Sequence, residues 1–245
     1  MVHVEMIATL TVKFVPQRLS LSEAYAYSAA LIENLGELTP DFRQWWGMPK
    51  GPKDHFVSFV ERSRIIARTE ADDAEFPELR HAGAPGLLLT NAGDEASWRA
   101  RGRVGLAISP SFGSIRISIS DVEVVFERPS RVLWTILDAM SKRPDVCLIQ
   151  TNVKQRVGAD LLLYSLHRAP FPHREFLGWM GYVDEALTRD QVPAAEKLER
   201  RGNGTLILAT DVLDLSDPHA VQQANQVEMS LVDLGLLPVI DPALK

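Results

Sequence analysis

The side chains best suited to metal binding or nucleophilic chemistry are few and poorly spaced in this chain. His167 and His173 lie six residues apart across Ala-Pro-Phe-Pro, and no His-Glu-x-x-His pattern occurs. The single cysteine, Cys147, cannot form a structural zinc site alone, and its neighbours Val146 and Leu148 favour buried packing. We therefore predict no metal site, no cofactor and an inert, buried cysteine.

The glycine motifs of common enzyme classes are missing as well. No Gly-x-Ser-x-Gly nucleophile elbow occurs, and the stretch from Gly47 to Lys53 lacks the Gly-Lys-Ser/Thr ending of a phosphate loop. Gly202-Asn203-Gly204 lacks the third glycine of a dinucleotide loop and leads into a strand, so it predicts a hairpin or helix-to-strand turn. No catalytic residue is assigned.

Carboxylates are plentiful and gather in two places. Five of the nine residues in the 70–78 tract are acidic, which predicts a loop or a frayed helix end, and Asp184-Glu185 form a second doublet. Adjacent acids are usually solvated, because a catalytic pair needs two carboxylates brought face to face from distant positions. A hydrolase using scattered carboxylates with His167 or His173 is the enzymatic alternative.

The overall charge argues against nucleic acid as a partner. Lys and Arg number 26 against 32 Asp and Glu, so the net charge is −6, and a mildly acidic chain repels phosphate. The local arginine groups are interpreted as solvated faces: Arg62, Arg64 and Arg68 on a helix, and Arg99, Arg101 and Arg103 on a strand. No apolar run approaches 18 residues and Glu5 stands where a signal peptide is basic, so we expect a cytoplasmic protein without a membrane partner.

Patterns typical of strands and helices alternate along the chain. Ser20 and Glu23 form a capping box for a helix that Gly36 would end, and Pro218 opens a final helix that Gly235 ends. The other predicted helices cover 54–68 and 129–143. The predicted strands cover 4–15, 42–46, 97–108, 112–119, 122–126, 146–153, 176–183 and 204–210.

These elements predict an α+β fold with mixed, mainly antiparallel sheets and about four helices. The order strand, helix, strands begins near residue 4 and again near residue 121, which suggests two similar halves, 1–120 and 121–245. A duplication of one α+β unit and a single mixed sheet decorated by four helices both agree with this order.

The second half also carries an ordered set of short motifs. They are Gly178-Trp179-Met180, Val192-Pro193-Ala194, Gly204-Thr205-Leu206-Ile207, Asp214, Asp217-Pro218-His219, Ala224-Asn225 and the run 231–238. In this order they resemble the immunity protein 52 family of bacterial polymorphic-toxin systems. The resemblance covers roughly residues 175–240 and is looser elsewhere, although the tryptophan-rich segment 42–47 also suits it. Val192 stands where a leucine is expected.

The resemblance implies a toxin-neutralising binding protein rather than an enzyme, in a toxin or type VI secretion setting, with a nuclease toxin as the expected partner. Because a nuclease presents a basic surface to its substrate, an acidic inhibitor would be steered to it. The expected interface acids are Glu70, Asp72, Asp73, Glu75, Asp184 and Glu185. The inhibitor would cover the active site or block toxin self-association. A structural adaptor in a secretion-linked operon is a third hypothesis.

Two details follow for single residues. Trp45 and Trp46 are adjacent on a predicted strand and must point to opposite faces, so one of them is a candidate interface anchor. The alternative is that both are packed internally. Asn225 is polar within a helix that otherwise packs, so its side chain is expected to hydrogen-bond to a neighbouring element.

Overall fold

The computed structural model has an α+β fold and describes residues 6–51, 53–75, 86–100, 104–241 and 243. Contacts divide the chain into two compact units. The N-terminal unit comprises residues 13–119, and the C-terminal unit comprises residues 120–245 together with residues 1–12. The first strand of the chain therefore belongs to the C-terminal unit, although the whole N-terminal unit separates it in sequence from the rest of that unit.

The sheet of the N-terminal unit is antiparallel with the order β6-β5-β4-β2-β3. Its strands are β2 (Trp46–Gly47), β3 (Val57–Ser58), β4 (Leu87–Thr90), β5 (Val104–Ser109) and β6 (Ser114–Ile119). Ile115, Ile117 and Ile119 are buried while Arg116 between them is exposed, so the predicted half-buried strand is confirmed.

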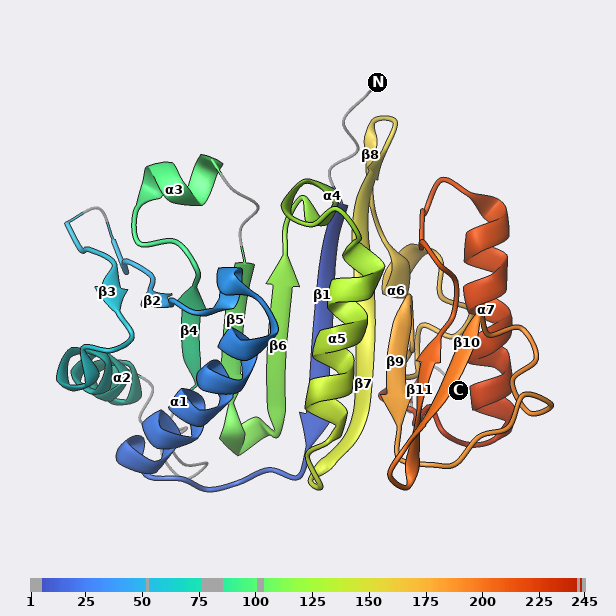
Figure 1. Ribbon diagram of the computed structural model, residues 1–245, viewed down its shortest axis with the longest axis horizontal. Coiled ribbons are helices and arrows are strands. Elements are labelled where there is room, and N and C mark those ends of the chain that lie inside the picture. The colour runs from blue at the N-terminus through green and yellow to red at the C-terminus, as the bar shows by residue number, and fades with distance from the viewer. Residues whose placement is uncertain (1–5, 52, 76–85, 101–103, 242, 244–245) are drawn as a thin grey trace. The chain divides into compact units, whose positions relative to one another are not determined.

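Helix α1 (Leu21–Leu38) packs on one face of this sheet (Figure 1). Its capping box is present as predicted: the Ser20 hydroxyl accepts from the Glu23 N–H, and the Glu23 carboxylate accepts from the Ser20 N–H at 2.8 Å. The prediction that Gly36 ends the helix is wrong. Gly36 is buried inside the last turns, where an added Cβ would lie 3.4 Å from Cα of Arg43, so this glycine permits a close approach.

Three other predictions for this unit are corrected by local hydrogen bonding. Residues 42–46 are mostly not a strand, because Pro40 opens a 3₁₀ turn, η1 (Pro40–Phe42), and only Trp46 enters β2. The Asp54 carboxylate closes a loop by accepting from the Lys50 and His55 N–H groups, so it does not start a helix there. The Asp94 carboxylate accepts from the Ser97 N–H and caps a short helix, α3 (Glu95–Ala100), where the sequence predicted a strand.

The second helix is α2 (Arg62–Glu75), eight residues later than predicted. It buries Ile65 and Thr69, and the Thr69 hydroxyl donates to the Ile65 carbonyl. Of the two alternatives predicted for the acidic tract 70–78, residues 70–75 form a helix end rather than a loop, and residues 76–78 lie outside the described residues. A short 3₁₀ turn completes the unit. This turn, η3 (Pro110–Phe112), leads through Gly113, at φ 59°, into β6.

The sheet of the C-terminal unit has the order β10-β11-β9-β7-β1, and β8 pairs with β7. Its strands are β1 (Met6–Phe14), β7 (Val146–Val157), β8 (Asp160–Leu163), β9 (Met180–Val183), β10 (Lys197–Arg201) and β11 (Gly204–Leu208). Gly202 and Asn203 join β10 to β11 in a hairpin, and Gly202 has φ 57°, so the hairpin alternative is confirmed.

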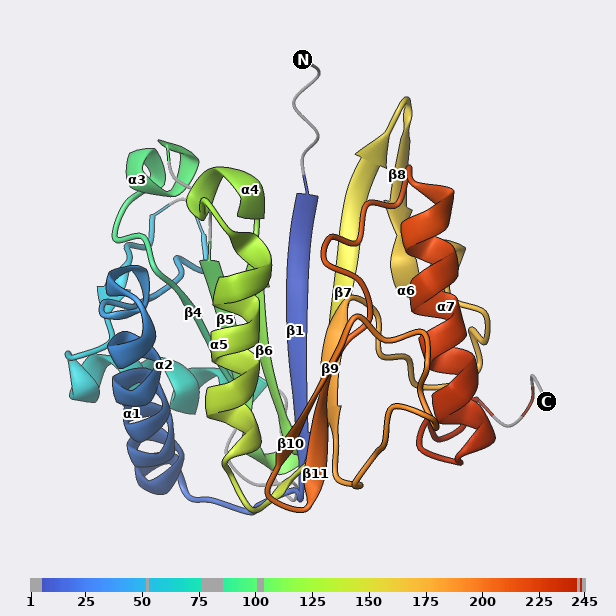
Figure 2. The same cartoon turned by 45° about the vertical axis from the view of Figure 1, so that its right-hand side comes forward.

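Helices α5 (Pro129–Ser141) and α7 (Pro218–Asp233) lie on opposite faces of this sheet (Figure 2). All four residues of β9 are buried, as two covered faces require. Pro129 and Pro218 stand in the first turns as predicted, and the Asp217 carboxylate caps α7 by accepting from the His219 N–H at 2.9 Å. The short helices are α4 (Val122–Val125) and α6 (Tyr164–His167).

Three expectations for this unit are wrong. Residues 122–126 form the turn α4 instead of a strand, since Asp121 adopts φ 49° and reverses the chain. The strand expected over 176–183 begins only at Met180, because Gly178 takes φ 75° against the Thr151 carbonyl. Cys147 is exposed rather than buried, since it lies on the outward side of β7 next to the buried Val146 and Leu148.

Buried polar contacts attach α7 to the rest of the C-terminal unit. The Tyr164 hydroxyl donates to Oδ1 of Asn225 at 3.0 Å, so the hydrogen bond expected for Asn225 is confirmed. Glu228 is 2% exposed, and its Oε1 accepts from the N–H groups of Leu177 at 2.9 Å and Gly178 at 2.8 Å. Burial raises the pKa of Glu228 to about 7, although these N–H groups act in the opposite direction.

Candidate partner-binding surface

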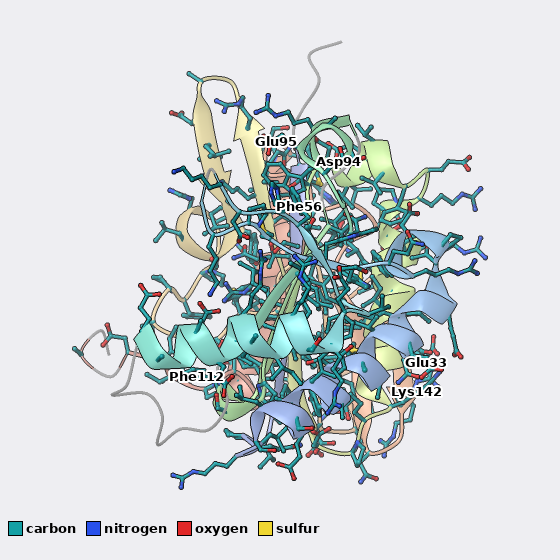
Figure 3. All side chains as sticks on the ribbon, turned by 90° about the vertical axis from the view of Figure 1, so that its left-hand side faces the viewer. Glu33, Phe56, Asp94, Glu95, Phe112 and Lys142 are labelled. Atoms are coloured by element: carbon teal, nitrogen blue, oxygen red, sulfur yellow. The ribbon has the colours of Figure 1, made fainter. Side chains whose placement is uncertain are left out.

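Helix α2 carries most of the predicted interface acids and lies on the outside of the N-terminal unit (Figure 3). Ile65 and Thr69 fix its inward side. Glu70 and Glu75 are exposed and Asp72 is half-buried. Asp73 belongs to the same turns of the helix, but its side chain lies outside the described part of the structure.

The charges of α2 are separated along its length. Arg62 and Arg64 lie in the first turn, and the last turns hold only acids among their charged side chains. A helix is electropositive at its N-terminus and electronegative at its C-terminus, so the acids of the last turns are unfavourably placed, whereas Glu61, directly before the helix, offsets the arginines of the first turn. Each such placement costs about 0.3–1 kcal/mol at an exposed site.

The basic end of α2 is occupied by contacts within the unit. The guanidinium of Arg62 lies 5.6 Å from the ring centroid of Tyr25 and donates to the Ser22 hydroxyl. Arg64 forms an ion pair with Glu61 at 2.6 Å. Arg64 therefore has an acidic partner, whereas Arg62 contacts an uncharged ring and a hydroxyl.

Arg68 and Lys50 join the helix to the loop after β2. Arg68 pairs with Asp54 and also donates to the carbonyls of Met48 at 3.0 Å and His55 at 2.7 Å. The backbone N–H groups of Lys50 and His55, followed by Arg68, hold the pKa of Asp54 below its ordinary value. This network keeps the loop against α2.

The acidic end contrasts with the basic end. Asp72 pairs with Lys50, whereas Glu70 and Glu75 make no ion pair with any other described residue. The two carboxylates are both exposed, but at five residues apart they point to different flanks of the helix. Among the described acidic side chains of α2, these two are the exposed ones.

The two tryptophans have different environments. Trp45 is 2% exposed, and its indole N–H donates to the Phe42 carbonyl at 2.8 Å. This burial removes Trp45 as an interface anchor, because exposing it would unpack the core. Trp46 is half-buried in β2, and a Cβ added to Gly93 would lie 2.9 Å from its ring, so the Gly93 backbone covers part of it. Trp46 stays a candidate anchor.

Asp184 and Glu185 lie in the C-terminal unit, directly after β9. Both side chains are exposed. The Tyr182 hydroxyl donates to Oδ1 of Asp184 at 3.1 Å, and burial together with this carboxylate raises the pKa of Tyr182 to about 12. The structure thus places these acids in a different unit from α2, and they form a separate candidate.

The described residues also bear on metal chemistry. They contain no group of three or more His, Cys, Asp and Glu side chains able to hold an ion. His167 contacts the backbone of Leu163 through Nδ1, and the carbonyl of His173 accepts from Ile240. Arg99 lies on α3 instead of a strand and pairs with Glu95 at 2.7 Å. Arg101 and Arg103 lie outside the described residues.

Sequence reasoning missed one feature beside α2. The apolar run Leu87–Leu89 forms β4 and, together with α2, lines a cavity of about 210 Å³. Three consecutive leucines after Gly86 were a usable strand signal. The sequence pattern does not predict that these leucines line a cavity together with a helix that ends 12 residues earlier in the chain.

Comparisons with known proteins add little to this picture. No family model and no curated protein matches the chain. Among solved structures, a distant neighbour is the Pseudomonas aeruginosa T6SS protein PA0821, with 12% sequence identity and a TM-score of 0.47. The match covers 93% of this chain and 73% of that chain. In the described part of the chain, no helix combines the length and apolar character needed to cross a bilayer.

Proposed function

We propose that this chain is an immunity protein that binds a cognate bacterial toxin and neutralises it by direct contact. The expected partner is a nuclease effector of a toxin or type VI secretion system, met in the cytoplasm. The observation that carries the proposal is the acidic end of α2, where Glu70 and Glu75 are exposed and unpaired among the described residues. The ordered motifs of the second half support the same class of protein.

The physical basis is electrostatic complementarity. A nuclease needs a basic surface for its substrate, and unpaired carboxylates on an inhibitor raise the rate at which the two proteins meet. Because α2 stores this charge against its own dipole, a cationic partner would relieve an unfavourable field as it binds. The role is binding, so no residue of the chain is assigned to catalysis.

The test starts from the reading frame next to this gene, where we expect a toxin domain to be encoded. The wild-type chain is expected to bind that domain and to protect bacteria that express it. The double variant Glu70→Gln, Glu75→Gln should associate several-fold more slowly at low salt, with a weaker dependence of the association rate on salt.

A matched control removes two other exposed acids of the same unit. Glu33 and Glu37 lie four residues apart on α1 and are both exposed (Figure 3 labels Glu33). Their replacement by Gln changes the net charge equally but leaves α2 intact. Equal effects of the two double variants would show that only net charge matters and would contradict an α2 interface.

A further inference from the structure

Strand β10 (Lys197–Arg201) lies at the end of the sheet of the C-terminal unit, and Figure 2 shows this edge between α5 and α7. It pairs with β11 on one side, and no described residue pairs with it on the other. The residues next to the undescribed parts of this unit attach elsewhere. Met6 begins β1, which three strands separate from β10, and the Asp241 N–H donates to the His173 carbonyl. In the described part of the chain, the outer edge of β10 thus has backbone groups without a strand partner.

One face of β10 carries charges that have partners within the unit. Lys197, Glu199 and Arg201 lie on the side of α5. The Lys197 Nζ is 4.4 Å from the ring centroid of Trp134, and Arg201 pairs with Asp138. Lys197 and Glu199 also pair with each other at 2.8 Å. These contacts hold the side chains of this face along the strand.

The opposite face carries Glu196, Leu198 and Arg200, because successive side chains of a strand alternate. Glu196 precedes the strand, and its N–H still donates to the Ala209 carbonyl at 3.4 Å, so the pairing with β11 reaches it. Glu196 and Arg200 are exposed, and neither forms an ion pair with a described residue. Two unpaired charges of opposite sign therefore flank the half-buried Leu198.

The order of these charges is complementary to its own reverse. If two copies of β10 pair in antiparallel fashion about a two-fold axis at Leu198, Lys197 lies opposite Glu199 of the second copy. Glu196 then lies opposite Arg200 of the second copy. Every charged side chain from 196 to 200 thus meets one of opposite sign, and the two Leu198 side chains meet at the axis.

Backbone geometry allows this register. Odd residues pair with odd residues and even with even, so the peptide groups that face away from β11 in one copy face those of the other. Moving the axis by one residue in either direction keeps this property but sets Glu199 or Lys197 directly against its own copy. Like charges placed across two strands are destabilising, so the axis at Leu198 is favoured.

We propose that β10 is an interface between two copies of this chain, which form a dimer whose antiparallel sheet is continuous across a two-fold axis at Leu198. Charges on an edge strand hinder pairing with a foreign strand, because they meet no matching charges there. A second copy supplies the matching charges, including partners for Glu196 and Arg200. The inference does not depend on the proposed function.

The test follows the mass of the full-length chain over a range of concentrations by sedimentation equilibrium. The wild-type chain should dimerise reversibly. Glu196→Arg and Arg200→Glu each set like charges against one another at two positions, so each should raise the Kd of the dimer about tenfold or more. Asp160→Arg makes the same charge change as Glu196→Arg at an exposed position of β8, and it should leave this Kd unchanged.

Charge exchange separates the proposed register from a general loss of stability. The double variant Glu196→Arg, Arg200→Glu restores opposite charges across the axis and should dimerise like the wild type. The two single variants should also form a mixed dimer when they are combined, because the two acids of one copy then face the two arginines of the other.

Three results would overturn the proposal. The first is a wild-type chain that stays monomeric at every concentration, and the second is a dimer that neither single variant weakens. The third is a dimer lost in the single variants that neither the double variant nor the mixture restores. If a monomeric chain bound the toxin domain and Arg200→Glu weakened that binding, the edge would serve the toxin and not a second copy.

Discussion

Glu228 is a carboxylate that its surroundings keep almost entirely out of water. Burial raises its pKa from the ordinary 4.5 to about 7, so between these values the folded state holds a proton that the unfolded chain has released. Stability must therefore fall as pH rises through this window and level off above it. The free energy of unfolding should be about 3 kcal/mol lower once Glu228 is ionised in both the folded and the unfolded state.

The variant Glu228→Gln should lose this dependence. Its amide oxygen can still accept from Leu177 and Gly178, but no proton is taken up on folding. When the free energy of unfolding is measured by urea denaturation between pH 4.5 and 8, the value for the wild type should fall relative to that for the variant as the pH rises. Asp233→Asn, an exposed acid just beyond the core turns of α7, is the control, and parallel curves for wild type and Glu228→Gln would contradict a raised pKa.

The tryptophan pair shows why site residues were harder to predict than strands. Alternation along a strand says that neighbours face opposite ways, and the sequence suggested one inward and one outward ring. Which ring is buried depends on what lies above each face. Phe42 and its carbonyl receive Trp45, while Gly93 comes from nearly fifty residues away to lie on Trp46. Such long-range cover leaves no local pattern.

At the scale of the element, α1 begins where its capping box says it should. The Ser20 hydroxyl accepts from the Glu23 N–H, which otherwise lacks an intrahelical partner. Ser20→Ala should lower the free energy of unfolding by about 1 kcal/mol, measured by urea denaturation. Ser20→Asp retains a capping oxygen and should stay near wild type. Equal losses in both variants would assign the effect to something other than the cap.

Helix α2 offers a test in which stability and binding move in opposite directions. Glu75→Lys places a cation at the electronegative end and should raise the free energy of unfolding by about 0.3–1 kcal/mol. The same change removes an exposed acid of the proposed interface, so association with the toxin domain should slow. Glu37→Lys, in the last turn of α1, gives the same helix-end benefit away from α2. A Glu75→Lys variant that binds as fast as wild type would exclude the acidic end from the interface.

The predicted elements succeeded where local sequence was decisive. The isoleucine alternation in β6, Pro129 in α5 and Pro218 in α7 each fix structure within a few residues. The predicted elements are wrong where a side chain forms a hydrogen bond to the nearby backbone that the pattern does not reveal. The carboxylates of Asp54 and Asp94 do so. The cavity between α2 and β4 required tertiary knowledge, because its walls come from three separate segments.

At the scale of the whole molecule, charge is divided unevenly between the units. Residues 13–119 hold 13 basic and 13 acidic side chains, so this unit is neutral. The entire net charge of −6 belongs to the C-terminal unit, which includes Asp184 and Glu185. Under the proposed function, long-range attraction of a cationic partner would arise in the C-terminal unit, while the exposed acids of α2 would act at short range in the N-terminal unit.

The division into units predicts how fragments will behave. A fragment of residues 121–245 lacks β1, whose Ala8, Leu10 and Val12 are fully buried. It should show weak amide protection and bind a hydrophobic dye. Joining residues 1–12 to residues 120–245 by a flexible linker should restore a cooperative unfolding transition. We call the arrangement nested, because the N-terminal unit lies in sequence between the two parts of the C-terminal unit. A stable, protected 121–245 fragment would contradict the need for β1 in this nested arrangement.

The nested arrangement also has a consequence for synthesis on the ribosome. Strand β1 is the first part of the C-terminal unit to emerge, yet β7, its neighbour within that unit, starts only at Val146. The 107 residues of the N-terminal unit can fold in the meantime, since all of them are made before residue 120. β1 therefore leaves the ribosome long before β7, its partner within the C-terminal unit, has been made. Folding of the later unit should be the slow step, and chaperones that shield exposed strands should raise the yield.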